Sequence, residues 1–330
     1  MKMRYKLERA VAIRAAIKAT ALCRDVQAGI KSAERITKAD SSPVTVADFG
    51  SQAIVNLEIK EAFPDDQIMA EEDSSALRSS ERLRFEVVSR VCRFIKDISE
   101  DEVLTAIDYG KFTGCSRGRY WAVDPIDGTK GFLRGEQYAV AIGLIENGKV
   151  VVGVLGCPNL ALDFMDESSE KGSLLVAVQD QGAYMRAYTS EREREIRVSR
   201  VKDPAKARFT ESYESAHSSH HRSARIAELL AIKKAPLRMD SQCKYAVVAR
   251  GEVTIYLRLS VRADYQEKVW DHAAGSIIVQ EAGGMITDSN GRALDFSAGR
   301  QLSNNQSIIA TNGAIHEAVL AALIKTAASG

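Results

Sequence analysis

The sequence predicts a protein of mixed α and β structure, in which an α+β half is followed by an α/β half. The chain has 330 residues, roughly two domains at about 150 residues each. The apolar fraction of 45% and the charged fraction of 27% are ordinary for a globular protein. Helical periodicity gives way to short Val/Ile-rich runs near Arg119 and alternates with them after residue 200. We therefore expect two domains, 1–200 and 201–330.

In the first hundred residues, apolar residues recur on one face at helical spacing. The segments expected here are helices at 4–30, 48–62, 81–98 and 101–109 and a short strand at 67–70. Antiparallel strands are expected next, at 120–123, 138–145, 149–156, 172–178 and 182–186. The run Glu146-Asn147-Gly148 favours a hairpin turn, because Asn and Gly tolerate positive φ. The charged run 190–195 is typical of a solvated loop or edge.

The second half alternates helices with strands, which is typical of an α/β layer. The expected elements are a helix at 220–231, a strand at 253–259, a helix at 271–282 and a closing helix at 313–328.

Charge and cysteine content limit the partners and the compartment. The net charge is +1, so no overall field attracts nucleic acid or an anionic membrane. The five cysteines form no CxxC pair, which favours reduced thiols inside the cell. The charged N-terminus lacks the apolar core of a signal peptide, and no apolar run approaches the roughly 20 residues of a membrane span. We expect a cytoplasmic monomer, with targeting to an organelle left open.

The strongest candidate for chemistry is the run Asp124-Pro125-Ile126-Asp127-Gly128-Thr129, which follows an apolar strand. A turn there can direct both carboxylates and the Ile126 carbonyl to one point. The backbone N–H groups of Gly128 and Thr129 suit a phosphate oxygen. Taken alone, the spacing favours an ordinary turn in which Asp ends a strand.

Other acidic residues lie where predicted elements begin or end. Glu71 ends a strand, and Asp48 and Asp271 stand at helix entrances, where they could be ordinary N-caps. Glu72 and Asp73 could simply be solvated. If these acids meet the pair described above, two like charges about 5 Å apart repel by roughly 3 kcal/mol at an effective dielectric of about 20. Such a cluster requires cations, and all-oxygen ligands favour Mg²⁺ over zinc.

Several other kinds of chemistry lack their sequence patterns. The five histidines form no HExxH pair, and no Cys/His cluster has zinc spacing. A GxxxxGK[ST] loop, a GxGxxG fingerprint and a recognisable nucleophile elbow are all missing from the sequence.

Longer runs carry a family resemblance. The run 124–129, together with Trp270-Asp271-His272-Ala273-Ala274-Gly275, resembles the paired signature of the lithium-sensitive inositol monophosphatase superfamily. The runs that narrow it to the 3′(2′),5′-bisphosphate nucleotidases of fungi and plants are 42–48, 129–137, 240–245 and 256–259. The resemblance extends from about residue 5 to residue 325 and implies an alternating αβαβα sandwich.

The resemblance also implies an activity and the residues that perform it. The activity is Mg²⁺-dependent removal of the 3′-phosphate from adenosine 3′,5′-bisphosphate (3′-phosphoadenosine 5′-phosphate, PAP), giving AMP. It extends to the 5′-phosphosulfate analogue (PAPS), with lithium inhibition and a role in sulfur assimilation and salt tolerance. The implied ligands of two or three Mg²⁺ ions are Glu71, Asp124, the Ile126 carbonyl, Asp127 and Asp271. Asp48 and Thr129 match the pair that orients and deprotonates the attacking water. The implied substrate contacts are Gly128, Thr129, His217, Ser241, Lys244 and Arg258.

Two other functions remain open at this point. One is an inositol polyphosphate 1-phosphatase or inositol monophosphatase activity on the same fold, which the extension 130–137 argues against. The other is a nucleotide sensor without catalysis, which the intact acidic set argues against. Lys244 and Arg258 could also be surface cations, and Ser241 a turn residue.

Overall fold

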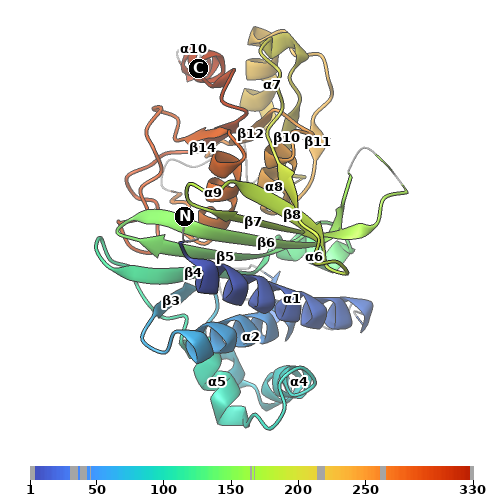
Figure 1. Cartoon of the computed structure of the whole chain (residues 1–330), viewed down its shortest axis with the longest axis vertical. Coiled ribbons are helices and arrows are strands. Elements are labelled where there is room, and N and C mark those ends of the chain that lie inside the picture. Colours follow the sequence, from blue (N-terminus) through green and yellow to red (C-terminus); the bar gives the residue numbers. More distant parts are fainter. Residues whose placement is uncertain are drawn as a thin grey trace.

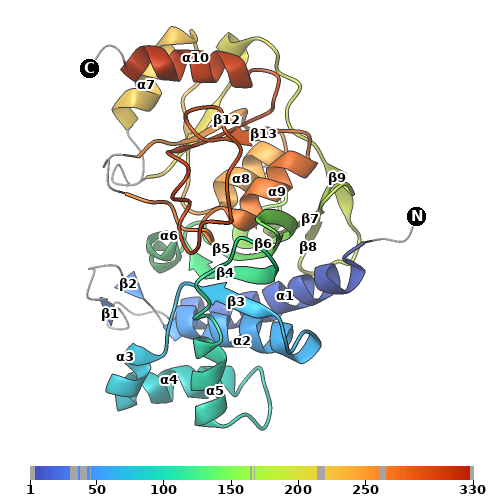
Figure 2. The same cartoon turned by 90° about the vertical axis from the view of Figure 1, so that its left-hand side faces the viewer.

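A computed structural model describes residues 4–29, 36–37, 43–44, 46–163, 166, 168–213, 220–260 and 265–327. Its elements stack in five layers, helix–sheet–helix–sheet–helix (Figures 1 and 2). This arrangement confirms the αβαβα sandwich expected from the resemblance. No helix in the described ranges is both long enough and apolar enough to cross a membrane.

The larger sheet has seven strands, in which only β3 and β4 run parallel. Its strands in spatial order are β3 (Gln67–Ala70), β4 (Arg119–Asp127), β5 (Ala139–Glu146), β6 (Lys149–Ala161), β7 (Lys171–Val178), β8 (Ala183–Ala187) and β9 (Arg194–Ile196). Strand β9 begins inside the charged run and forms the sheet edge. The predicted strand ending at 123 was too short, because β4 continues to Asp127 with a register shift against β5 between Asp124 and Asp127.

Helices α1 (Lys6–Gly29) and α2 (Val46–Ala62) cover the outer face of this sheet (Figure 2). Fully buried alanines along α1 let the two helices approach closely, so that a Cβ at Gly50 would lie 2.9 Å from Leu22 Cδ1. The shorter helices beyond α2 are α3 (Ser75–Ser79), α4 (Glu81–Val91) and α5 (Glu100–Asp108). The expected helix 81–98 was too long: it ends at Val91, and Asp97 has a φ of 56°.

The central layer contains α8 (Cys243–Ala249) and α9 (Ala273–Glu281). Two glycines of the larger sheet allow α9 to pack closely against it. A Cβ at Gly143 would lie 2.9 Å from Ala273 Cβ, and one at Gly153 would lie 2.4 Å from Ile277 Cγ2. The start of α9 is therefore held against β5 and β6, and β5 is the neighbour of the strand β4 that carries the acidic run.

The smaller sheet has five strands and lies between α8/α9 and an outer helix layer. Its strands in spatial order are β11 (Leu237–Arg238), β10 (Phe209–Glu211), β12 (Ile255–Arg258), β14 (Ile308–Thr311) and β13 (Met285–Thr287). The outer helices are α7 (His220–Leu229) and α10 (His316–Ala327). The remaining short elements are β1 (Ile36–Thr37), β2 (Pro43–Val44), α6 (Thr129–Arg134) and η2 (Pro204–Lys206).

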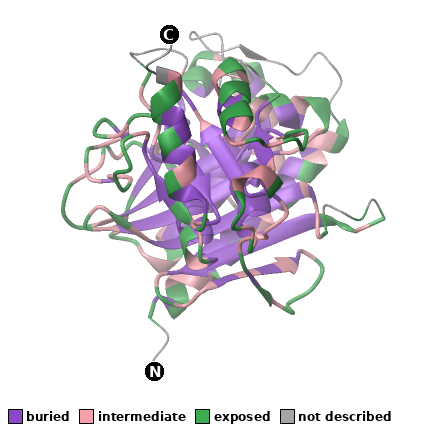
Figure 3. Cartoon of the chain, turned by 90° about the horizontal axis from the view of Figure 1, so that it is seen from above, coloured by how far each residue is buried: buried purple, intermediate pink, exposed green. Residues whose placement is uncertain are grey.

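Burial follows the layers: the strands and central helices are buried, and the outer helices expose one face (Figure 3). The two sheets are joined by the segment 197–208, which contains the predicted boundary at residue 200. Because α8 and α9 contact both sheets, the division into two domains stays a prediction.

Candidate active site

Five acidic residues predicted for the site come from four separate parts of the fold. Asp124 and Asp127 lie at the bulged end of β4, and Glu71 directly follows β3. Asp48 lies in the first turn of α2, and Asp271 lies in the loop before α9. Since β3 and β4 are adjacent and parallel, their carboxyl ends bring Glu71 close to Asp124 and Asp127.

Asp124 is the centre of this group. Its side chain is 2% exposed. Burial raises its pKa well above the ordinary value, and Glu71, Asp127, Asp271 and Asp48 raise it further. All four of the other acids are thus close enough to oppose ionisation of Asp124. The structure brings together the acids that the sequence predicted.

One carboxylate oxygen of this cluster lacks the partner that a buried oxygen needs. Asp124 Oδ1 is buried and has no hydrogen-bond partner. A buried carboxylate oxygen needs a cation or a proton. The surrounding donor set is carboxylate and carbonyl oxygen, which a hard cation such as Mg²⁺ prefers. The residues therefore fit a metal ion.

Asp127 is held from the C-terminal half of the chain. The backbone N–H of Gln242 donates to Asp127 Oδ2. Burial and then Asp271 raise the pKa of Asp127 to about 6, against the opposing effect of Lys244 and Arg258. Two cations therefore lie beside the acids and offset only part of their charge.

The ordinary N-cap role proposed as an alternative for Asp48 and Asp271 is wrong. Helix α2 begins at Val46, so Asp48 lies inside its first turn, 1% exposed. The N-cap of α9 is His272, not Asp271. Glu72 is buried and hydrogen-bonded through its backbone to the Gln52 side chain, so it is not simply solvated.

The glycine–threonine step starts a short helix beside the acids. Gly128 has a φ of 87°, which favours glycine, and it is the N-cap of α6. A Cβ on Gly128 would also lie 2.8 Å from Ser241 Cβ. The Thr129 hydroxyl donates to the Ile126 carbonyl oxygen at 3.3 Å, so its pairing with Asp48 stays a prediction.

The predicted substrate contacts have different surroundings. Lys244 is not a surface cation: it is 2% exposed, and burial lowers its pKa to about 8. Arg258 is also largely buried and forms ion pairs with Glu267 and Asp271. Ser241 serves as a turn residue, with a φ of 67° and a hydroxyl that accepts from Cys243 N. His217 lies outside the described residues.

A second group of ligand-type side chains lies next to the cluster. Atoms of Glu267, Asp271 and His272 are within 4.8 Å of one another. Glu267 already forms ion pairs with Arg258 Nε at 2.7 Å and His272 Nε2 at 3.0 Å. Burial alone would raise the pKa of Glu267, but Arg258 and His272 outweigh this effect and lower the pKa to about 2. This group has its own counter-charges, unlike the acids around Asp124.

Sequence reasoning missed three residues that shape the site. Gln242 donates its side-chain amide to Trp270 O and accepts from Gly275 N, which joins the loop carrying Asp271 to α8. Glu267 holds Arg258 as described. Arg300 contacts both the end of β3 and Trp270. Gln242 and Trp270 fall within the runs that carry the resemblance, whereas Glu267 and Arg300 have no local signal.

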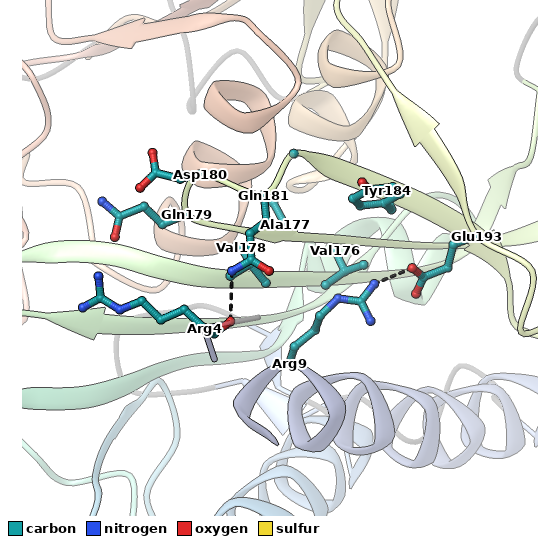
Figure 4. A pocket seen from close by; sticks show the side chains of 11 residues that line it. Arg4, Arg9, Val176, Ala177, Val178, Gln179, Asp180, Gln181, Tyr184 and Glu193 are labelled. Atoms are coloured by element: carbon teal, nitrogen blue, oxygen red, sulfur yellow. Dashed lines mark hydrogen bonds and ion pairs between the residues drawn. The ribbon is translucent and has the colours of Figure 1, made fainter. Parts of the chain in front are cut away.

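A cavity of about 610 Å³ lies elsewhere, between the start of α1 and strands β7 and β8 (Figure 4). Val176 and Val178 line it, and two other lining residues, Arg9 and Glu193, form an ion pair. It contains none of the predicted site residues.

Comparison with known proteins identifies the family of this chain. A model of the inositol monophosphatase family matches residues 6–328. The chain belongs to this family. Within it, the chain is 44% identical to a 3′(2′),5′-bisphosphate nucleotidase of Emericella nidulans, over 98% of this chain and 99% of that protein. It is 42% identical to one of Schizosaccharomyces pombe, over 97% and 96%.

Solved structures share the fold. Extragenic suppressor protein suhB of Bartonella henselae superposes with a TM-score of 0.66 at 23% identity, covering 95% of this chain and 97% of that one. The family match and the curated relatives confirm the resemblance predicted from the sequence runs, and this member of the inositol monophosphatase family is a phosphatase.

Proposed function

We propose that this phosphatase is a Mg²⁺-dependent 3′(2′),5′-bisphosphate nucleotidase that hydrolyses PAP to AMP and phosphate. It would also convert PAPS to adenosine 5′-phosphosulfate, and Li⁺ would inhibit it. The observation that carries the proposal is the unpartnered buried oxygen of Asp124 among four other acids, with two buried cations alongside. The names of the curated relatives support the choice of substrate.

The acidic residues would hold the metal. Its ligands would be Glu71, Asp124, the Ile126 carbonyl, Asp127 and Asp271. When bound, Mg²⁺ supplies positive charge that lowers the pKa of water and stabilises charge on the phosphate and leaving oxygens.

The protein's own groups would orient the reactants. Thr129 Oγ1 and the Asp48 carboxylate would position the water and take its proton, and the backbone N–H groups of Gly128 and Thr129 would donate to the phosphate. The water oxygen bonds to phosphorus as the bond to the ribose 3′-oxygen breaks in line. The ribose oxygen leaves as a hydroxyl by taking a proton from solvent water, and the proton that Asp48 accepted returns to solvent.

The cations would select a substrate with two phosphates. Lys244 and Arg258 lie beside Asp127, and they would bind the phosphate that does not react. Ser241 and His217 would complete the nucleotide contacts. A near-neutral chain needs such local cations to hold a doubly phosphorylated ligand.

Phosphate release tests the proposal. PAP, PAPS and inositol 1,4-bisphosphate are compared at equal concentrations with Mg²⁺, with EDTA and with Mg²⁺ plus Li⁺. We expect PAP to be preferred, EDTA to abolish release and Li⁺ to reduce it. Rates that ignore EDTA would refute the metal mechanism. A preference for the inositol would assign the chain to the inositol phosphatase alternative.

A further inference from the structure

Arg300 joins two parts of the chain that each carry a proposed metal ligand. It lies in the segment between β13 and β14, and its guanidinium reaches the end of β3. There Nη2 donates to the Ala70 carbonyl at 2.5 Å, and Nη1 donates to the Phe112 carbonyl at 3.0 Å. Ala70 is the residue directly before Glu71.

The same side chain also contacts the residue before the other ligand. The Arg300 guanidinium lies over the Trp270 ring, 4.5 Å from its centroid, and Trp270 directly precedes Asp271. The backbone reinforces this contact, because Val269 N donates to Arg300 O at 3.1 Å. The guanidinium is therefore held at its edge by backbone carbonyls and on one face by the Trp270 ring.

Arginine suits this arrangement better than lysine. Its planar fork donates to several carbonyls at fixed angles and stacks on an aromatic face, whereas lysine is a flexible point charge. The positive charge of Arg300 does not explain why an arginine stands here, because a cation beside Glu71 opposes the binding of Mg²⁺. The contacts point to a geometric role.

We propose that Arg300 is a positioning residue that holds Glu71 and Asp271 in the mutual geometry that Mg²⁺ requires. This inference rests on the proposed function, since it needs those two acids to be ligands. Mg²⁺ demands near-ideal octahedral geometry, so small displacements of one ligand relative to the other weaken binding.

The test is Arg300→Lys, which keeps the charge and removes the fork. A matched control is Arg24→Lys. Arg24 also donates to a backbone carbonyl, that of Pro158, and lies over an aromatic ring, that of Tyr188, but it contacts no predicted site residue. Mg²⁺ is titrated into substrate-free protein by calorimetry at constant ionic strength, and thermal unfolding is followed in EDTA.

We expect Arg300→Lys to bind Mg²⁺ about tenfold more weakly, the lower end of the range for residues that orient metal ligands. The Mg²⁺ concentration for half-maximal turnover should rise equally, while KM for PAP at saturating Mg²⁺ stays within about twofold. Arg24→Lys should bind Mg²⁺ as the wild type does.

Three outcomes would overturn the proposal. In the first, Arg300→Lys keeps wild-type Mg²⁺ affinity, even if its Tm falls, which would show a purely structural role. In the second, Arg24→Lys loses the same affinity. In the third, the wild type shows no saturable Mg²⁺ binding, which would remove the proposed function as well.

If Arg300→Lys does not fold, Trp270→Phe carries the test. It reduces the stacking surface and keeps every hydrogen bond of the guanidinium. We expect Mg²⁺ affinity to fall about threefold, since a partly exposed cation–π contact contributes about 0.5–1 kcal/mol. Unchanged affinity in this variant would overturn the proposal.

Discussion

Two groups of charged side chains adjoin Asp271, and they differ in how their charges are balanced. In one, Glu267 meets Arg258 and His272, and its pKa is lowered to about 2. In the other, the pKa values of Asp124 and Asp127 are raised, and one Asp124 oxygen has no partner. Charges left unbalanced beside a balanced group are typical of a functional site.

The largest expected effect comes from neutralising the unbalanced group. Asp127→Asn removes a proposed ligand but keeps an oxygen that can accept from Gln242 N. We expect turnover of PAP to fall by on the order of 10³-fold, because loss of several kcal/mol of metal-assisted stabilisation costs tenfold per 1.4 kcal/mol. In EDTA, the Tm at pH 7 should equal or exceed that of the wild type, because a repelling charge has gone.

Asp65→Asn is the control for this variant. Asp65 is exposed near the start of β3, at the opposite end from Glu71. It should leave both turnover and Tm unchanged. Retained turnover in Asp127→Asn, or a Tm well below that of the wild type in EDTA, would place Asp127 among the balanced structural charges.

The balanced group should respond in the opposite way. Glu267→Gln leaves Arg258 buried without its main counter-charge, and removing one partner of a buried ion pair costs about 3 kcal/mol or more. We expect the free energy of unfolding to fall by about that amount with or without Mg²⁺. Denaturant unfolding in both conditions measures it.

Glu228→Gln provides a surface comparison. Glu228 pairs with Arg225 on α7, where both side chains are exposed, and such pairs contribute about 0–1 kcal/mol. A Glu267→Gln protein as stable as Glu228→Gln would show that the buried network does not stabilise the fold.

The contributions of the two groups to stability should also depend on pH in opposite ways. Folding raises the pKa of Asp127 from 3.8 to about 6, so this carboxyl favours the folded state while it is protonated. Its contribution is complete below about pH 4 and is lost as the pH rises through about 6. Folding lowers the pKa of Glu267 from 4.5 to about 2, so its contribution is complete above about pH 4.5 and is lost as the pH falls from there through about 2.

Thermal unfolding in EDTA from pH 4 to pH 7 measures this difference. Carboxyls that do not interact with Asp127 cancel when the Tm of Asp127→Asn is subtracted from that of the wild type, so the difference reports Asp127 and the acids coupled to it. We expect the difference to become more negative as the pH rises, and added Mg²⁺ to stabilise the wild type more at pH 7 than at pH 5. A Tm difference that stays constant with pH would show that folding does not raise the pKa of Asp127.

The unbalanced group was the more predictable one from sequence. Asp124 and Asp127 lie three residues apart after an apolar strand, and the resemblance supplied Glu71 and Asp271. The balanced group has no such local pattern. The contact between Arg300 and Ala70 likewise spans 230 residues, and no periodicity reports a contact of that kind.

The fold shows the same limit. Long helices with one apolar face were predicted, but α8 was missed because all seven of its residues are buried, which leaves no amphipathic period. Strands β10, β11 and β13 have only two or three residues. The helix predicted at 81–98 was too long because Phe94, Ile95 and Ile98 pack against the core beyond the helix end.

The smallest expected effect on stability belongs to a cation of the unbalanced group. Burial lowers the pKa of Lys244 to about 8, while Asp127 and Asp240 favour its charged form. Lys244→Met removes both the desolvation cost and the attraction, so the free energy of unfolding should change by less than about 1 kcal/mol. KM for PAP should nevertheless rise about tenfold, because a charge-assisted contact to the unreacted phosphate is lost.

Lys233→Met, at an exposed position, should change neither quantity. A Lys244→Met protein as destabilised as Glu267→Gln would mean that the lysine balances the acids for folding, and the contrast between the two groups would then disappear.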